Sequence, residues 1–316
     1  MKYIFVIFVL ILPLFAGKMQ TPVDKYIASS SVTDMVVQKN RLYVATDGSC
    51  IDIFNLKSKK LVQKITIEKI EDFMGDIIDA KIFSVDIINN KILILSQGMQ
   101  GYRRVYIYEN DALSLLIQES DSLSIAKAKF IDKNTIFLAL LSDEIISYDM
   151  KKHHKNYRVS ASASKFSDFA LSDDKRKVAV VDESGDMQLL RTKDGSHIHS
   201  YSGENLDNVF GVDYKSHFIA TAGQDRRIVI YNTQTNAAYY KSSSFFIYCV
   251  GFSPSGKLAA YSSDVKNNIT LFNTSTKINI AQYKGTKSTL SKILFLDEKT
   301  FLVSSNSRTI NLYKVR

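Results

Sequence analysis

Short runs of apolar residues, each interrupted after a few positions by polar turn residues, recur along the whole chain. Seven segments share one form, which is a strand, a polar turn that usually contains Asp, and a second strand that ends in an aliphatic and an aromatic residue. The segments lie at 44–55, 96–110, 140–150, 180–191, 221–232, 261–273 and 303–314. Apolar and polar residues alternate in them with a period of two, which indicates β-strands and excludes helical repeats.

The spacing of these segments predicts the architecture. The seven equivalent strand-end positions are Phe54, Tyr108, Tyr148, Leu190, Tyr231, Phe272 and Tyr313, and all but Leu190 are aromatic. After a first interval of 54 residues, the intervals are 40, 42, 41, 41 and 41. A period of about 40–45 residues with four short strands per unit is typical of a propeller. We therefore expect an all-β, seven-bladed β-propeller that forms a single domain.

The blade boundaries follow from the same repeat. Blade 1 begins near Val32, and the next five blades span about 83–117, 126–159, 166–201, 208–241 and 246–283. Blade 7 starts after 290 and has room for only three strands before Arg316. We expect Thr21–Ala28 to supply its fourth, outer strand, because this pairing removes open sheet edges.

The first residues have the pattern of a secretory leader. Lys2 precedes an apolar run, Tyr3–Phe15, and Ala16 offers a small residue for cleavage. We expect a signal peptide over 1–16, a mature propeller over 17–316 and a periplasmic location, with an uncleaved anchor as the alternative. Cys50 and Cys249 fall in distant blades, so we expect two buried thiols and no disulfide.

The repeats resemble WD40 repeats. Asn208–Lys241, which contains TAGQDRRIVIYN, and the hairpin FSPSGKLAA at 252–260 are the most similar units. Five residues match the turn aspartate of that family, namely Asp47, Asp143, Asp182, Asp225 and Asp264. The chain has no Trp, and Phe, Tyr or Leu takes its place. The whole chain is similar to the accessory WD-repeat proteins of periplasmic nitrate reductase systems in ε-proteobacteria. This resemblance implies a non-enzymatic role in the maturation or support of the nitrate reductase complex.

Motifs that carry catalysis are missing from the sequence. There is no GxGxxG, P-loop, HExxH, GxSxG or CxxC, so we expect a non-catalytic protein without cofactor or metal. Asp86, Asp168 and Asp213 lie on inner strands and could ring a central channel. A hydrolase-type propeller with a central divalent ion is therefore one alternative, and an envelope-assembly scaffold is another. His197 and His199 fall on an outer strand and are interpreted as exposed polar residues.

Charge adds a second expectation. The net charge is +9, which favours anionic lipid, wall polymer or acidic protein as contacts of an exported monomer, and not nucleic acid. One face should be basic, with Lys57, Lys59, Lys60, Lys133, Lys151, Lys152, Lys155, Lys175, Arg176, Lys177, Lys193, Lys215 and Lys257. The other should be acidic, with Asp47, Glu71, Asp72, Asp76, Glu119, Asp121, Asp143, Glu144, Asp182, Glu183, Asp186, Glu204 and Asp207. The basic face could meet a membrane surface.

The long first interval predicts where a protein partner docks. Apolar residues in 67–81 recur at helical spacing, which predicts a helix of about three turns over 68–79. The second insertion is the loop 98–104, on the same face of blade 2. Tyr and Arg often dominate binding energy. The candidate partner-binding residues are Ile70, Phe73, Met74, Ile77, Tyr102, Arg103 and Arg104.

Overall fold

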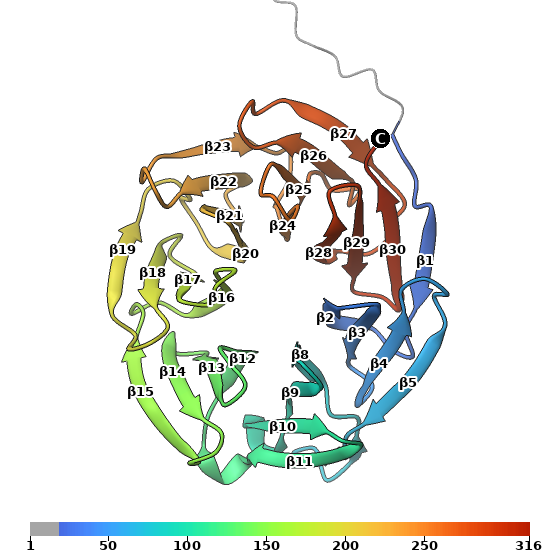
Figure 1. Ribbon diagram of the computed structural model, residues 1–316, viewed down its shortest axis with the longest axis vertical. Helices are drawn as coiled ribbons and strands as arrows, with labels where there is room; N and C mark the ends of the chain where they lie inside the picture. The colour runs from blue at the N-terminus through green and yellow to red at the C-terminus, as the bar shows by residue number, and fades with distance from the viewer. Residues whose placement is uncertain (1–18) are drawn as a thin grey trace, which may run out of the picture.

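Seven four-stranded antiparallel sheets form a closed ring around a central channel (Figure 1). The computed structural model describes residues 19–316, so the expected leader over 1–16 lies outside the described residues. Each sheet is one blade, and its strands run from the channel to the rim. Among the described residues, none of the helices is long and apolar enough to cross a membrane.

The strands of blades 1 to 4 have the following bounds. Blade 1 holds β2 (Val32–Gln38), β3 (Arg41–Thr46), β4 (Cys50–Asn55) and β5 (Leu61–Thr66). Blade 2 holds β8 (Ile82–Ile88), β9 (Lys91–Gln97), β10 (Arg103–Glu109) and β11 (Ala112–Ile117). Blade 3 holds β12 (Ile125–Phe130), β13 (Thr135–Leu140), β14 (Glu144–Asp149) and β15 (His154–Ser160). Blade 4 holds β16 (Phe166–Leu171), β17 (Lys177–Asp182), β18 (Met187–Arg191) and β19 (His197–Tyr201).

The remaining blades continue the order. Blade 5 holds β20 (Val209–Lys215), β21 (Phe218–Gly223), β22 (Arg227–Asn232) and β23 (Ala238–Ser242). Blade 6 holds β24 (Val250–Phe252), β25 (Leu258–Ser262), β26 (Ile269–Asn273) and β27 (Asn279–Tyr283). Blade 7 holds β28 (Leu290–Asp297), β29 (Thr300–Ser305), β30 (Thr309–Lys314) and, on the rim, β1 (Asp24–Ile27). Two 3-10 turns, Met99–Gly101 and Glu119–Asp121, and the pair β6 (Ile70–Glu71) and β7 (Ile77–Ile78) complete the elements.

The hydrophobic core is divided into clusters that lie between neighbouring blades. Seven clusters of buried side chains can be distinguished, one at each junction around the ring. Because each blade is covered on both faces, its middle strands bury consecutive residues; β3, for example, buries five in a row. Strict alternation of apolar and polar positions, expected from the sequence, therefore does not hold for these strands, since alternation requires one solvated face.

The ring closes as expected from the sequence. Strand β1 pairs antiparallel with β30, from Asp24 opposite Leu312 to Ile27 opposite Thr309. Figure 1 shows the blue N-terminal strand on the rim of the red C-terminal blade. The Tyr26 side chain enters the core between blades 7 and 1, where its ring meets that of Phe54 at 5.6 Å and its hydroxyl donates to the Leu56 carbonyl at 3.0 Å.

Polar contacts secure the passage from β1 into blade 1. The Ser29 amide donates to a carboxylate oxygen of Asp52 at 2.6 Å, and the Ser29 hydroxyl donates to the other oxygen at 2.8 Å. Asp52 is fully buried on β4, and the Sγ of the buried Cys50 lies 3.0 Å from the Ser29 hydroxyl. Both cysteines are free and buried, as expected, and burial raises the pKa of Cys249 to about 12.

Blade 5 contains a side-chain network that links its loops and strands. The Thr221 hydroxyl donates to Asn205 at 2.5 Å, the Asn205 amide reaches Asp225 at 3.4 Å, and Asp225 accepts the Leu206 amide at 2.8 Å. Tyr231 also reaches the Asn205 side chain, at 3.5 Å. This network forms without the His and Trp of typical WD40 repeats, in the blade that resembles them most.

The loop charges follow the expected division into two faces. Loops that join the two inner or the two outer strands of a blade form what we name the basic face, with 13 Lys or Arg and six Asp or Glu. Loops that join the two middle strands or successive blades form the acidic face, with 15 Asp or Glu and eight Lys or Arg. The hairpin β6–β7 belongs to the acidic face.

Truncating the buried tyrosine of the closing strand should open the ring. We expect Tyr26→Ala to lower the free energy of unfolding by about 3–5 kcal/mol, since it leaves a cavity in the core between blades 7 and 1. Ile27→Ala on the same strand is the control, because Ile27 is exposed and its loss should cost less than about 1 kcal/mol. Chemical denaturation followed by circular dichroism measures both, and equal stability of the two variants would refute the closure model.

Candidate functional site

The insertion between blades 1 and 2 is a β-hairpin and not a helix. Ile70 pairs with Ile78 and Glu71 with Ile77, so the helix expected over 68–79 is wrong. The turn explains the difference. The Asp72 carboxylate accepts the amides of Met74 and Asp76, and Gly75 adopts a φ of +88°. A side chain that bonds to the following backbone amides, and a glycine with positive φ, favour a tight turn over helix continuation.

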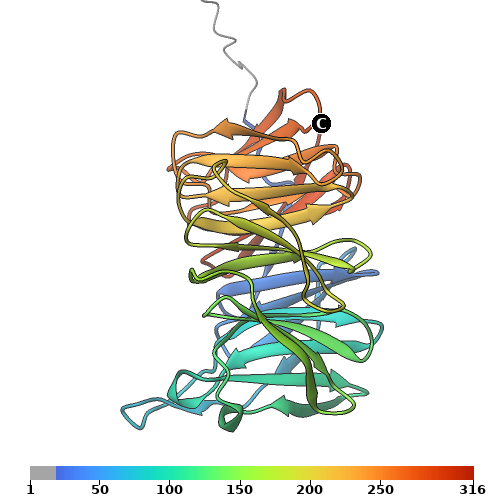
Figure 2. The same ribbon diagram turned by 90° about the vertical axis from the view of Figure 1, so that its left-hand side faces the viewer.

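The hairpin separates the expected apolar face into a buried base and an exposed tip. Ile70 is buried in the core between blades 1 and 2, where the half-buried Ile78 packs beside it. Phe73, Met74 and Ile77 are 95%, 72% and 67% exposed. Figure 2 shows this light-blue segment projecting from the ring. Large apolar side chains on a projecting turn are typical of a binding surface.

The second predicted contact region, the loop 98–104, is held by contacts within the protein. The Arg103 guanidinium stacks on the Phe83 ring at 4.2 Å and donates to the Gly101 carbonyl at 2.6 Å. Arg104 donates to Glu119 at 2.5 Å and lies 3.8 Å from Glu68, near the base of the hairpin. Tyr102 is half-buried. The two arginines therefore position the insertions, and the exposed apolar side chains of this region are those of the hairpin tip.

Charged side chains from six of the seven inner strands line a channel cavity of about 680 Å³. They are Asp34 on β2, Asp86 on β8, Lys127 and Lys129 on β12, Asp168 on β16, Asp213 and Lys215 on β20 and Lys292 on β28. The sequence predicted Asp86, Asp168 and Asp213 as channel residues, but Asp34, Lys127, Lys129 and Lys292 were missed. The same sequence pattern could have predicted these four residues, because each lies on an inner strand at the same alternating positions as Asp86, Asp168 and Asp213.

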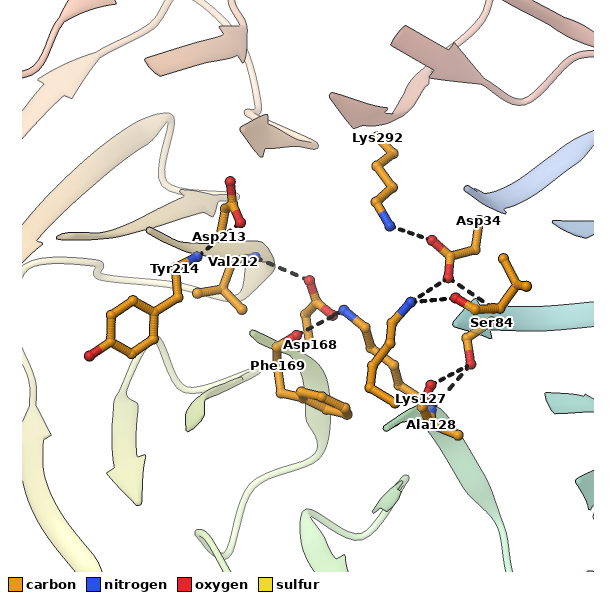
Figure 3. Close-up of polar contacts among 12 residues, drawn as sticks. Asp34, Ser84, Lys127, Ala128, Asp168, Phe169, Val212, Asp213, Tyr214 and Lys292 are labelled. Atoms are coloured by element: carbon orange, nitrogen blue, oxygen red, sulfur yellow. Dashed lines mark hydrogen bonds and ion pairs between the residues drawn. The ribbon is translucent and has the colours of Figure 1, made fainter. Parts of the chain in front are cut away.

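These charges are joined across blades (Figure 3). Asp34 lies 2.9 Å from the Lys129 Nζ and 2.5 Å from the Lys292 Nζ, and Lys127 lies 2.6 Å from Asp168. Burial raises the pKa of Asp34, but the two lysines outweigh burial and hold that pKa well below its usual range. Burial lowers the pKa of Lys292. The ammonium of Lys292 lies in a site that it shares with two other lysines, which explains why Asp34 does not reverse this shift.

Each channel carboxylate also accepts a backbone amide of the next blade. Asp34 accepts the Val85 amide at 3.0 Å, Asp86 the Phe130 amide at 2.8 Å, Asp168 the Val212 amide at 3.1 Å and Asp213 the Phe252 amide at 2.7 Å. Burial raises the pKa of Asp213. These bonds occupy the carboxylates expected for a central ion. Across residues 19–316, no group of three or more His, Cys, Asp and Glu side chains could hold a metal.

The histidines of the outer strand β19 make local contacts. His197 lies 2.8 Å from the Ser200 hydroxyl, and the His199 ring packs against Tyr201 with centroids 4.4 Å apart. His197 is exposed, and His199 is half-buried.

One turn aspartate differs from the other four that match the WD40 position. Asp47, Asp182, Asp225 and Asp264 accept hydrogen bonds within their turns or from the preceding linker. Asp143 has a φ of +60° and is fully buried, and neither carboxylate oxygen has a hydrogen-bond partner within residues 19–316. The hydroxyl of nearby Ser162 donates to Asp182 instead. Burial raises the pKa of Asp143 to about 7, and the charge of Asp182 adds to this shift.

No protein-family model matches the chain, and no curated protein matches it either.

The buried carboxyl of Asp143 predicts an unusual pH dependence. Its pKa is about 7 in the folded protein and about 4 in the unfolded chain, so its contribution to stability is complete below pH about 4 and is lost as the pH rises through 7. Asp143→Asn, which stays neutral, should therefore be more stable than the wild type at pH 8, by about 2–4 kcal/mol, and not at pH 4.

The control for this measurement is Asp47→Asn, because Asp47 accepts hydrogen bonds from Ser30 and from the Ser31 amide. It should show no gain at pH 8. Unfolding by urea across the pH range gives the two difference curves, and a flat curve for Asp143→Asn would contradict the assignment.

Proposed function

We propose that this protein is an exported, non-catalytic propeller that binds a protein partner through the tip of the hairpin β6–β7. The observation that carries this proposal is the exposure of Phe73, Met74 and Ile77 at the end of an insertion that breaks the repeat of the ring. Burying three such side chains against a partner would contribute several kcal/mol, since a fully buried large apolar side chain contributes about 1.5–3 kcal/mol.

The channel supports a structural role for its charged residues. Its lysines and carboxylates are held in ion pairs and in bonds to the backbone of adjacent blades. Acid–base catalysis requires titratable groups that can reach a substrate proton. In this ring, the titratable groups of the channel are bonded to neighbouring blades. We therefore propose that the activity is binding, through the loops on the surface.

The resemblance of the whole chain supports a finer proposal. We propose that the partner belongs to a periplasmic oxidoreductase system of the nitrate reductase type, and that the propeller assists its maturation or support. An envelope-assembly scaffold is the second candidate, since an exposed apolar hairpin on a rigid ring would serve either partner. The identity of the captured protein decides between them.

The basic face suggests how the propeller is oriented. With 13 basic and six acidic residues in its loops, this face should attract anionic lipid or polymer while the hairpin on the opposite face binds its partner. Association with anionic vesicles that weakens as salt is added would support this orientation, and its absence at low salt would remove it.

Replacing the hairpin tip tests the proposed function. We expect Phe73→Ser with Met74→Ser to reduce partner recovery at least tenfold in a pull-down from a periplasmic extract, because the apolar contact is lost while the fold is kept. Val265→Ser is the matched control, since Val265 is an exposed apolar residue in a turn of blade 6, with 67% exposure against 72% for Met74. Tyr102 and Arg103 are less suitable targets, because truncating Arg103 would also uncover Phe83.

Mass spectrometry identifies the captured protein. Subunits of a molybdenum oxidoreductase would support the accessory role, and envelope-assembly proteins would replace it with the scaffold. Full recovery by a folded double variant would remove the hairpin tip from the binding surface.

A further inference from the structure

Blade 6 departs from the other blades at its inner edge. Its inner strand β24 has three residues, whereas the inner strands of the other blades have six to eight. The sequence predicted a start near 246, but the strand begins at Val250. The segment before it, Phe245–Cys249, is irregular and carries three aromatic residues. In blade 6, an irregular aromatic loop thus takes the place of the first residues of the inner strand.

The aromatic residues of this loop form a cluster with one residue of blade 5. Phe210 stacks on Tyr248 with centroids 5.4 Å apart, and Phe246 lies 6.4 Å from each of them. Phe245 stacks on Phe246 at 4.9 Å. All four rings are half-buried, and we name this group the aromatic mouth.

The aromatic mouth lies at the acidic-face end of the channel. The second residues of the other inner strands line the cavity together with Phe210 and Tyr248, and they are Thr33, Phe83, Ala126, Ser167 and Ser291. Four of these five are small, and the ring of Phe83 is covered by Arg103. The inner strand of blade 6 contributes no charged side chain to the channel. The opening is therefore aromatic and uncharged beside blades 5 and 6, and mostly small side chains of the other inner strands line the rest of it.

The charges around the aromatic mouth indicate the kind of ligand. On the acidic face, the loops that lead into or lie within blades 4, 5 and 6 carry five carboxylates besides the internally bonded Asp225, namely Glu183, Asp186, Glu204, Asp207 and Asp264, against Lys165, Arg226 and Lys266. Lys165 is already paired with Glu183 at 2.8 Å. An apolar pocket inside an acidic surface is complementary to an apolar group flanked by cations.

We propose that the aromatic mouth binds an extended peptide segment in which an aromatic or large aliphatic side chain is flanked by Lys or Arg. The apolar side chain enters the channel between Phe210, Tyr248 and the small residues opposite, and the flanking cations face the carboxylates of the surrounding loops. This site is separate from the hairpin tip in sequence and in blade, so it does not depend on the proposed function of β6–β7.

The test is direct binding of a short synthetic peptide to the full chain. A fluorescein-labelled peptide with one central Phe between Lys residues is compared with two controls, in which Ala replaces the Phe or Glu replaces each Lys. Fluorescence anisotropy should show saturable binding of the first peptide and at least tenfold weaker binding of both controls. Phe210→Ala with Tyr248→Ala should weaken binding at least tenfold. Tyr240→Ala, on the outer strand β23, and Phe73→Ser should bind as the wild type does.

Each of the following results would overturn the proposed peptide site or part of it. No saturable binding of the Phe–Lys peptide, or equal binding by the folded double variant, overturns the site, and equal binding of the Glu peptide overturns the cationic specificity. Should the double variant fail to fold, Phe246→Ala removes one outer ring alone and is scored in the same way. Loss of peptide binding on Phe73→Ser would assign the peptide to the hairpin and overturn the proposal for the mouth.

Discussion

The whole structure depends on one constraint, which is that each blade is apolar on both faces and must be covered by a neighbour on each side. Sheets of this kind cannot end in water, because the last blade would expose the apolar face that its neighbour should cover. A closed ring provides two neighbours for every blade, so the core consists of seven clusters between blades rather than one centre. The pairing of β1 with β30 creates the seventh cluster and links the two ends of the described chain.

The same constraint explains the chemistry of the channel. Inner strands converge at the axis, where their side chains must fill a narrow space without leaving polar backbone groups unpaired. Aspartates solve this by accepting amides of the next blade, and lysines pair with two of these aspartates. Removing one partner would leave a buried charge uncompensated, which is far more costly than the pair is stabilising. The channel charges thus join neighbouring blades.

Much of the fold could be predicted because one pattern recurs in seven segments, so a segment that is ambiguous by itself is interpreted from its equivalents. The strand-end aromatics gave the blade spacing, and the missing fourth strand of blade 7 pointed to the N-terminal segment. Local sequence was less informative where repeat and insertion meet. The apolar spacing of Ile70, Phe73, Met74 and Ile77 fits a helix, but the turn formed by Asp72 and Gly75 makes it a hairpin with Ile70 buried and the others exposed.

The candidate sites were harder to predict than the fold. Arg103 and Arg104 looked available because no pattern shows that Phe83 and Glu119 would engage them. The channel lysines were not predicted, because a lysine on a strand is usually solvent-exposed and no local pattern shows that Asp34 and Asp168 would pair with them. The aromatic mouth requires contacts between Phe210 and a loop some 35 residues later in the chain, which a repeat of strands does not reveal.

Native-state hydrogen exchange tests the central claim most directly, which is that the ring is one cooperative unit closed by β1 and carries a free hairpin. The amides of Asp24–Ile27 should exchange with the same free energy of opening as those of β29, because neither can open without the loss of a core cluster. The amides at the tip of β6–β7 should exchange far faster. Exchange of β1 by a local opening well below the stability of the blades, or strong protection of the hairpin tip in the isolated protein, would contradict it.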